Sequence, residues 1–405
     1  MRRCRPFLLC WALPLAVLPW PATAAELDIR TLAVAAAPGS LAPRLTAGGE
    51  GSIVLSWTEP YAEGHRLVYA VLGSGWGEPV TVASGADWFV NWADFPSVLR
   101  VAEERWAAHW LVRRPAGGYA YDIAIATSAD GTRWSAAMTP HRDGTDSEHG
   151  FVTLYPNAAG FGAIWLDGRK TVLPAGSSRA DNGMTLRAAR FAAGPTAQDE
   201  AEIDGLVCDC CQTDVALAAG GPVAVYRDRS EGEIRDIAVA RFAAGRWQSP
   251  ARLAPDGWRI EGCPVNGPAI AAQGSRVAVA WFSAAGGEPR VQLAYSTDAG
   301  RHFGQPLEVT GEENYGRVRV VLLENGDAAV SWLCRVPGDG AVPCLRRVAA
   351  DGSRGPIRTL NAGGTVPALS VPQLARAGDD LVMAWTLGAG GVTRIASARF
   401  AAAQL

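Results

Sequence analysis

Apolar and polar residues alternate with a period of two along much of this chain, which is the pattern of half-buried β-strands. The stretch from Ala269 to Val309 carries this alternation most regularly. A short apolar run comes first, the segments RVAVAWFSA and RVQLAYS follow, and GQPLEV ends the stretch. Short turns that contain glycine separate these segments. The stretch therefore predicts a meander of four antiparallel strands.

The same meander recurs along the chain, and an aromatic residue ends each expected second strand. Aligned on that residue, the chain repeats at intervals of roughly 50 to 60 residues, which is within the range of propeller repeats. The aligned residues are Trp57, Trp110, Trp165, Tyr226, Trp281, Trp332 and Trp385. We therefore expect an all-β fold, a β-propeller of seven four-stranded antiparallel blades.

The last repeat, Pro372 to Phe400, is one strand short. The early segment Leu27 to Val34 has no blade of its own. We expect this segment to supply the missing outer strand and to close the ring, because closure removes the sheet edges that would otherwise pair with other chains.

The turn between the third and fourth strands of the first meander has the sequence STDAGRHF, from Ser296 to Phe303. Its Ser and Asp side chains can accept hydrogen bonds from turn amides, and its Gly can adopt a positive φ. A degenerate copy, Ser128 to Trp134, is one residue shorter. The octapeptide resembles the Asp-box, the bacterial neuraminidase repeat of the sialidase superfamily. The resemblance covers most of the mature chain and implies boxes on the outer rim of a propeller, with six blades as the alternative to seven.

The N-terminus has the features of an export signal. Arg2, Arg3 and Arg5 precede an apolar run, and Ala22-Thr23-Ala24 forms a cleavage site. We expect residues 1–25 to be a signal peptide, residues 26–405 to be a single propeller domain, and the protein to be periplasmic or secreted. No later stretch is apolar enough to span a bilayer, so we expect no membrane span.

Composition narrows the range of partners. The net charge of −3 and the 19% of charged residues give no electrostatic case for nucleic acid. We expect a monomer whose partner is a glycan or a small anionic ligand.

Propeller geometry places two classes of loop on one face, namely the loops that enter each first strand and those that join second to third strands. These loops hold most of the Arg, Asp, Trp, His and Cys residues with unusual chemistry, and loops on a rigid scaffold often carry function. The first class comprises residues 87–95, 141–151, 206–214, 256–267 and 312–317, and the second comprises 166–170 and 227–236.

Four arginines are expected on this face, beside Asp167, Asp228 and Asp236; they are Arg169, Arg227, Arg229 and Arg235. A guanidinium group binds a carboxylate with two hydrogen bonds, so the cluster suits an acidic sugar. Alternatively, the Arg and Asp side chains pair with one another and brace the loops.

Aromatic and titratable residues add to the same face. Trp92 and Asp94 suit stacking on, and bonding to, a sugar ring, although the neighbouring rings Trp88 and Phe95 are expected to fill the space between blades. His141 and His149 flank an acidic loop. They can act as acid or base, hold a metal ion or substrate, or brace the loop.

The resemblance to sialidases implies an arginine triad for the substrate carboxylate, a tyrosine nucleophile paired with a glutamate, and an aspartate as acid and base. The chain offers Tyr315, Glu231 (or Glu233) and Asp94 in a compatible order. The Arg-Ile-Pro motif of the family is absent; Arg44 follows Ala42-Pro43 instead, and no third arginine is clearly placed.

Six cysteines follow the expected signal peptide. Cys334 and Cys344 belong to partner strands of one hairpin, so we expect a disulfide between them. The other four open adjacent blades on the loop face: Cys208, Cys210, Cys211 and Cys263. They form two disulfides, or one disulfide with free thiols, or a thiolate site for a soft metal such as copper(I). The C-x-C-C spacing does not fit structural zinc.

Three functions therefore remain. The first is an exo-α-sialidase-type glycoside hydrolase acting on acidic glycans, which requires no cofactor. The second is a non-catalytic propeller that binds a glycan or a partner. The third is an exported protein that handles a metal such as copper, or redox chemistry, through the cysteine cluster.

Overall fold

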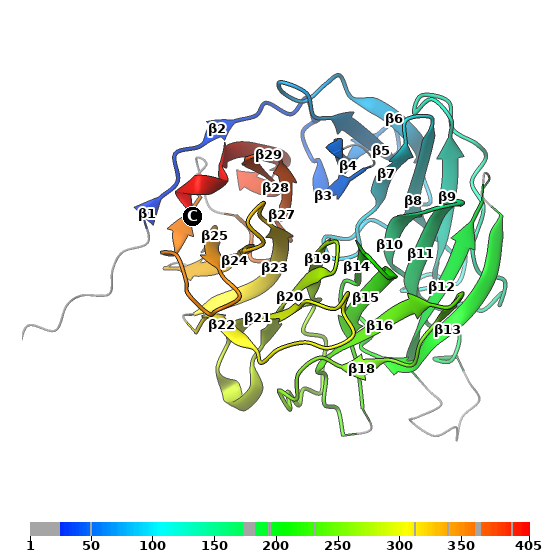
Figure 1. Cartoon of the computed structure of the whole chain (residues 1–405). Helices are drawn as coiled ribbons and strands as arrows, with labels where there is room; N and C mark the ends of the chain where they lie inside the picture. Colours follow the sequence, from blue (N-terminus) through cyan, green and yellow to red (C-terminus); the bar gives the residue numbers. More distant parts are fainter. Residues whose placement is uncertain are drawn as a thin grey trace, which may run out of the picture.

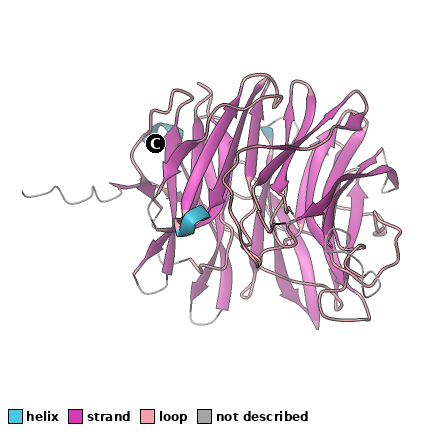
Figure 2. Cartoon of the chain, turned by 90° about the horizontal axis from the view of Figure 1, so that it is seen from below, coloured by secondary structure: helices cyan, strands magenta, loops and turns pink. Residues whose placement is uncertain are grey.

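A computed structural model describes residues 25–48, 51–172, 183–192, 194, 196–230, 232–311, 313–337, 340–360, 366–389 and 392–405. The expected signal peptide up to residue 24 lies outside these residues. In the described part of the chain, seven antiparallel sheets lie around one axis (Figure 1), and their strands stand side by side with loops at both ends (Figure 2). The seven-bladed β-propeller expected from the repeat is confirmed.

Each blade forms because its alternating segments bury one aromatic residue and pair in sequence order. Blade one comprises β3 (Leu41–Ala47), β4 (Ile53–Tyr61), β5 (Gly64–Val71) and β6 (Val80–Gly85). Blade two comprises β7 (Ser97–Ala102), β8 (Arg105–Arg113) and β9 (Tyr121–Ser128). Blade three comprises β10 (His149–Asn157), β11 (Gly160–Asp167), β12 (Met184–Phe191) and β13 (Ala197–Val207).

The remaining blades follow in chain order. Blade four comprises β14 (Asp214–Ala218), β15 (Gly221–Arg227), β16 (Ile237–Ala243), β17 (Arg246–Trp247) and β18 (Ala251–Arg252). Blade five comprises β19 (Ala269–Gln273), β20 (Arg276–Ser283), β21 (Arg290–Ser296) and β22 (Leu307–Thr310). Blade six comprises β23 (Asn314–Leu322), β24 (Ala328–Val336), β25 (Gly340–Val348) and β26 (Arg358–Thr359). Blade seven comprises β27 (Gln373–Ala377), β28 (Asp380–Ala389) and β29 (Val392–Ala401).

The N-terminal segment closes the ring. β2 (Arg30–Thr31) pairs antiparallel with β29 and completes blade seven, as expected. β1 (Ala25–Glu26) pairs with β26 and extends blade six, a parallel contact that the sequence analysis did not foresee. The two ends of the chain are thus joined through hydrogen bonds of neighbouring blades, which Figure 1 shows beside the C-terminus.

The core lies in wedges between the blades. Six of the seven aligned aromatic residues belong to the largest fully buried side chains, namely Trp57, Trp165, Tyr226, Trp281, Trp332 and Trp385. In the described residues, η2 (Ala285–Gly287) and η3 (Ala402–Gln404) are single helical turns. Within the described residues, no helix has the length and apolar character needed to cross a membrane.

Both Asp-boxes lie between a third strand and the next outer segment. In the first, Asp298 Oδ1 accepts hydrogen bonds from the amides of Arg301 and His302, and Gly300 has a φ of 76°. Phe303 packs against the apolar wedge between blades four and five. In the second, Asp130 Oδ1 accepts from the amides of Thr132 and Arg133. The boxes therefore brace the rim, as the sialidase resemblance implies.

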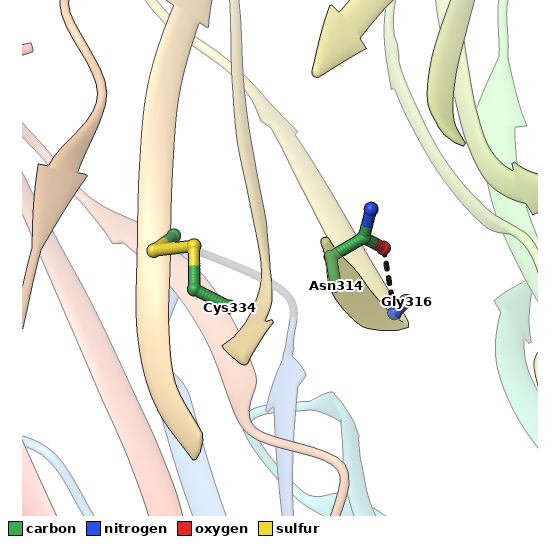
Figure 3. Close-up of a disulfide and its surroundings, with 4 residues drawn as sticks. Asn314, Gly316 and Cys334 are labelled. Atoms are coloured by element: carbon green, nitrogen blue, oxygen red, sulfur yellow. Dashed lines mark hydrogen bonds between the residues drawn. A yellow bond between two sulfur atoms is a disulfide. The ribbon is translucent and has the colours of Figure 1, made fainter. Parts of the chain in front are cut away.

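The disulfide between Cys334 and Cys344 is confirmed; its Cα atoms are 5.8 Å apart. It links β24 to β25, and Figure 3 shows it beside the start of β23, where the Asn314 side chain accepts a hydrogen bond from the Gly316 amide at 2.9 Å.

Candidate functional site

The first strands of the blades line a central cavity of about 560 Å³. Arg44 of β3 and Arg319 of β23 both line it, and Arg44 Nη2 lies 3.4 Å from Asp214 Oδ1. Burial, together with the charge of Arg44, lowers the pKa of Arg319 to about 9. Arg44, Arg319 and Asp214 thus all face the axis of the ring, with Arg44 paired to Asp214.

The loops expected on one face do touch one another. Gln212 Nε2 donates to the carbonyl oxygen of Ala93 at 2.8 Å, and the amide of Phe151 donates to Asp94 Oδ1 at 2.7 Å. The Arg235 amide donates to the carbonyl oxygen of Trp258 at 2.8 Å. Loops from blades two to five thus form one continuous polar surface, which we call the mouth.

Four thiols meet in the mouth. Cys208 Sγ lies 3.4 Å from Cys211 Sγ, and the sulfur atoms of Cys208, Cys210 and Cys211 lie within 4.8 Å of one another. Cys263, from the loop before blade five, is exposed and hydrogen-bonds Cys210, which lowers the pKa of Cys263. The sulfurs are not bonded to one another in the structure. The cluster therefore has a buried interior and one exposed thiol.

Guanidinium groups surround these sulfurs. Arg235 Nη1 donates to Cys208 Sγ at 3.2 Å. Burial alone would raise the pKa of Cys208, but hydrogen bonds from Cys210 and Cys211 and the charges of Arg235 and Arg227 bring it well below its ordinary value. Arg317 is half-buried near Cys210 and Cys211; this burial lowers its pKa to about 10, against the effect of these sulfurs. Cys208 is accordingly suited to being a thiolate.

The arginines of blade four divide into two kinds. Arg227 is buried and donates to the carbonyl oxygens of Arg235, Phe282 and Asn266 at 2.6, 2.8 and 3.0 Å, with its Cζ 4.7 Å from the Trp258 ring centroid. Its donors are used by the fold and leave no room for a carboxylate ligand.

Arg229 and Arg235 instead meet acidic side chains. Arg229 Nη1 lies 3.1 Å from Asp209 Oδ1, and Arg229 Nη2 lies 3.0 Å from Glu233 Oε1. Arg235 Nη2 lies 2.9 Å from Glu233 Oε2. Asp236 accepts from the amides of Gly257 and Trp258 at 3.1 and 3.0 Å and so shapes the loop before blade five.

A tyrosine joins two acids at the edge of the mouth. The Tyr121 hydroxyl lies 2.8 Å from both Asp94 Oδ2 and Glu148 Oε1. Burial raises the pKa of Asp94 to about 7 and that of Glu148 to about 8, and hydrogen bonds from Tyr121 offset part of both shifts. One phenol has one proton to donate, so a carboxyl group of this pair must hold a proton to complete both contacts.

A second titratable cluster lies between blades two and three. The imidazole rings of His141 and His149 stack with centroids 3.7 Å apart, and Asp122 and Asp143 face their two edges. Arg169 makes two contacts of 2.7 Å with Asp167 and one of 2.8 Å with Glu200. The guanidinium group of Arg169 is therefore paired with acidic side chains of the protein itself.

Of the residues proposed for sialidase chemistry, Asp94 is buried with both oxygens hydrogen-bonded. Tyr315 packs against the apolar cluster of blades six and seven, with Arg335 Cζ 4.8 Å from its ring centroid. Glu231 lies outside the described residues. Trp92 carries Arg317 over its ring, with Cζ 4.9 Å from the centroid. The structure thus places Asp94 and Tyr315 among different neighbours.

Sequence reasoning missed Tyr121 and Asp122 as members of the mouth, whereas Glu148 and Arg317 fall within the loops 141–151 and 312–317 that were expected on this face. Tyr121 and Asp122 lie at the start of β9, where polar residues at a strand end carry no local signal. Only their pairing across blades reveals them.

No protein-family model matches the sequence, and no protein of curated function matches it either. The fold is similar to that of the BP39L lectin from Burkholderia pseudomallei, at 12% identity over 89% of this chain and 95% of that chain, with a TM-score of 0.56. A protein of unknown function from Dyadobacter fermentans is similar at 14% identity over 93% of this chain and 99% of that one, with a TM-score of 0.51. The NanB sialidase from Streptococcus pneumoniae aligns at 10% identity over 96% of this chain and 71% of that chain, but its TM-score of 0.47 is too low to support an inference.

At these identities the likeness concerns the fold alone. The described residues confirm the seven-bladed propeller that the sequence favoured.

Proposed function

We propose that this protein is an exported propeller that binds a soft metal ion of the copper(I) class through thiolates of Cys208, Cys210, Cys211 and Cys263. The observation that carries the proposal is the convergence of these sulfurs, with Cys208 and Cys211 3.4 Å apart. Thiolates select soft ions over magnesium or calcium. Export is inferred from the basic, apolar and A-x-A segments of residues 1–25.

Charge supports this function. Two or three thiolates around one univalent ion leave a net negative charge, which is costly to bury unless it is compensated. Arg235 donates to Cys208, and Arg317 lies beside Cys210 and Cys211. The exposed Cys263 offers a first contact at the surface, from which an ion can pass to the buried sulfurs.

The test is a copper(I) titration of the purified, reduced protein against a chromogenic chelator that competes for the ion. We expect tight binding that is lost in a Cys208→Ser/Cys211→Ser double variant. The matched control is Cys334→Ser/Cys344→Ser, which also removes two sulfurs but leaves the mouth unchanged. Equal binding by all three proteins, or no binding by any, rejects the proposal.

A second candidate is recognition or hydrolysis of an acidic glycan, as the sialidase resemblance implies. Its support is Glu148, a half-buried acid with a pKa raised by burial to about 8, which can hold a proton at neutral pH at the edge of the mouth. The BP39L lectin, which has a similar fold, adds to this support.

A fluorogenic sialoside assay decides the catalytic form of this candidate. Turnover by the wild-type protein that falls at least 100-fold in both Glu148→Gln and Tyr315→Phe supports it. Turnover no greater than in these variants removes the hydrolase function and leaves glycan binding to be judged by a binding assay.

A further inference from the structure

The stacked histidines between blades two and three present a problem of unpaired hydrogen-bonding groups. His141 and His149 are buried, with 3% and 0% of their side chains exposed. In the described residues, His141 Nε2, His149 Nε2 and Asp122 Oδ1 are buried without a hydrogen-bond partner. Buried polar atoms are rarely left in this state, because each costs free energy.

Each ring has one nitrogen near Asp122 and the other near Asp143. At one edge, Asp122 Oδ1 lies 3.6 Å from both His141 Nε2 and His149 Nδ1. At the other, Asp143 Oδ2 lies 3.0 Å from His141 Nδ1 and 3.3 Å from His149 Nε2. At the Asp143 edge, His141 Nδ1 is hydrogen-bonded to Asp143 Oδ2, whereas His149 Nε2 makes no hydrogen bond despite its 3.3 Å distance. At the Asp122 edge, 3.6 Å is too long for a hydrogen bond.

Two neutral imidazole rings have too few N–H groups to donate from all four nitrogens to Asp122 and Asp143. Each neutral ring has one N–H and one lone pair. If both rings donate to Asp143, their lone pairs point side by side at the carboxylate oxygen of Asp122. Protonating both rings would stack two positive charges 3.7 Å apart in a buried place, which is unfavourable. A cation at the Asp122 edge resolves the conflict, since two ring lone pairs and one carboxylate oxygen can all bind it.

We infer that Asp122, His141 and His149 form a site for one divalent transition-metal ion of the zinc class. Ligand atoms about 2.0–2.1 Å from zinc lie about 3.3–3.6 Å from one another, which matches the spacing at this edge. Because the two ring planes are only 7° apart, both rings must rotate out of this stack before their lone pairs can meet at one ion. Two imidazoles and a carboxylate suit zinc rather than a soft univalent ion.

The surroundings have the features that support a metal site. Asp143 would hold the far nitrogen of both rings, which is the usual role of a carboxylate behind metal-binding histidines. Asp143 Oδ1 is itself fixed by the Thr145 amide at 3.0 Å. Arg114 Nη1 holds the other oxygen of Asp122 at 2.8 Å and leaves Oδ1 available. The carbonyl oxygen of Tyr121 lies 3.3 Å from His149 Nδ1 and can only accept a hydrogen bond from it, so an ion at this edge would replace that contact.

This site differs from the thiol cluster in ligands and location, so the two can be tested separately. The experiment is a titration of the chelator-treated full-length mature protein with cobalt(II) and then zinc(II). Cobalt bound by thiolates gives an intense charge-transfer band, whereas cobalt bound by imidazole and carboxylate gives only weak visible bands. We expect one equivalent of cobalt with weak bands only, displaced by zinc.

The variants define the site. His141→Gln and Asp122→Asn should abolish the weak bands, and Asp143→Asn should weaken zinc binding by about 10- to 100-fold, the range for such supporting carboxylates. His302→Gln is the matched control, because His302 also pairs with an aspartate but on the exposed rim. Cys208→Ser/Cys211→Ser should leave the weak bands unchanged.

Thermal unfolding of each variant shows whether it is folded. If His141→Gln does not fold, the isosteric variants Asp122→Asn and Asp143→Asn test the metal site in its place. Wild-type protein that binds no cobalt outside a thiolate band, or weak bands that survive in Asp122→Asn, overturns the inference. Failure of the copper(I) titration would leave it standing.

Discussion

Two histidine–aspartate pairs in this protein make the same contact in opposite surroundings. On the rim, His302 Nδ1 lies 2.6 Å from Asp298 Oδ2, and 87% of the histidine side chain is exposed. In the mouth, His141 Nδ1 lies 3.0 Å from Asp143 Oδ2, and 3% is exposed. Water can satisfy the second nitrogen of His302, whereas the second nitrogen of His141 needs a partner from the protein or an ion.

The comparison extends to the regions around the pairs. The side chains of the rim boxes fix their own turns within a few residues, and those of Arg133 and His302 face solvent. The mouth buries guanidinium groups, thiols and carboxylates together, so each must be paired, either within its own loop, as Arg169 is with Asp167, or from another blade, as Asp94 is by the Phe151 amide. Rim residues therefore stabilise their own turns, whereas mouth residues bring together polar groups that can bind a ligand.

The largest difference in stability between mouth and rim should appear when one arginine of each region is replaced. Arg227→Met removes four hydrogen bonds to three carbonyl oxygens. We expect a loss of about 3 kcal/mol or more in the free energy of unfolding, since each carbonyl oxygen left without a hydrogen-bond donor is costly. The exposed rim residue Arg301, changed to Met, should alter stability by less than about 0.5 kcal/mol. Chemical denaturation measures both, and equal effects would contradict the division between regions.

Metal removal should separate the two histidine pairs. If zinc binds at the mouth and is present at about 100 times its Kd, a chelator should lower stability by about 2.7 kcal/mol. We expect this loss in the wild type and in His302→Gln, and no loss in His141→Gln. Thermal unfolding with and without the chelator gives the result; a chelator effect that persists in His141→Gln would speak against a mouth metal.

The two regions should respond to pH in opposite directions. Burial raises the pKa of Asp94 to about 7, above its ordinary 3.8, so the folded protein holds a proton that the unfolded chain releases. The mouth should therefore lose stability as pH rises from about 4 to 7, by a few kcal/mol at most. Backbone hydrogen bonds from His302 lower the pKa of Asp298, so its contribution is lost only as pH falls in the acid range.

The measurement is the unfolding temperature at pH 5 and pH 8. Asp94→Asn should flatten the decline between these values, while Asp298→Asn should leave it unchanged. A wild-type protein that is more stable at pH 8 than at pH 5 in the absence of metal would show that Asp94 is ionised in the folded state.

The smallest effect is expected at the rim serines. Ser296 Oγ accepts hydrogen bonds from the amides of Asp298 and Gly300 at 3.3 and 3.0 Å. Ser296→Ala should cost about 0.5–1.5 kcal/mol, and Ser128→Ala a similar amount, because each loses only hydrogen bonds within its own turn. Metal binding by either variant should match the wild type. A change in metal affinity would show that rim and mouth are coupled.

Much of the fold could be predicted because its signals are local. The alternating segments, the aromatic ending each second strand, the boxes and the Cys334–Cys344 hairpin all lie within one blade. The missing strand of blade seven could be inferred by counting. The pairing of β1 with blade six could not, because two residues of extended chain carry no pattern.

The candidate site was predicted in location but not in arrangement. The loops of one face could be grouped by topology, which brought the four cysteines and the histidines together. Arg227 was assigned to a ligand because backbone carbonyls, its actual partners, leave no trace in a sequence. Tyr121 joins Asp94 and Glu148, each 27 residues away, so its role depends on how blades two and three meet.

The central claim is that the mouth keeps its thiols available for a metal ion. The most direct measurement is a count of free thiols in the unreduced protein under denaturing conditions, together with elemental analysis of the same sample. The account predicts four reactive thiols, corresponding to Cys208, Cys210, Cys211 and Cys263, or a bound soft metal that protects them. Zero thiols with no metal would mean that these cysteines form disulfides, and would contradict it.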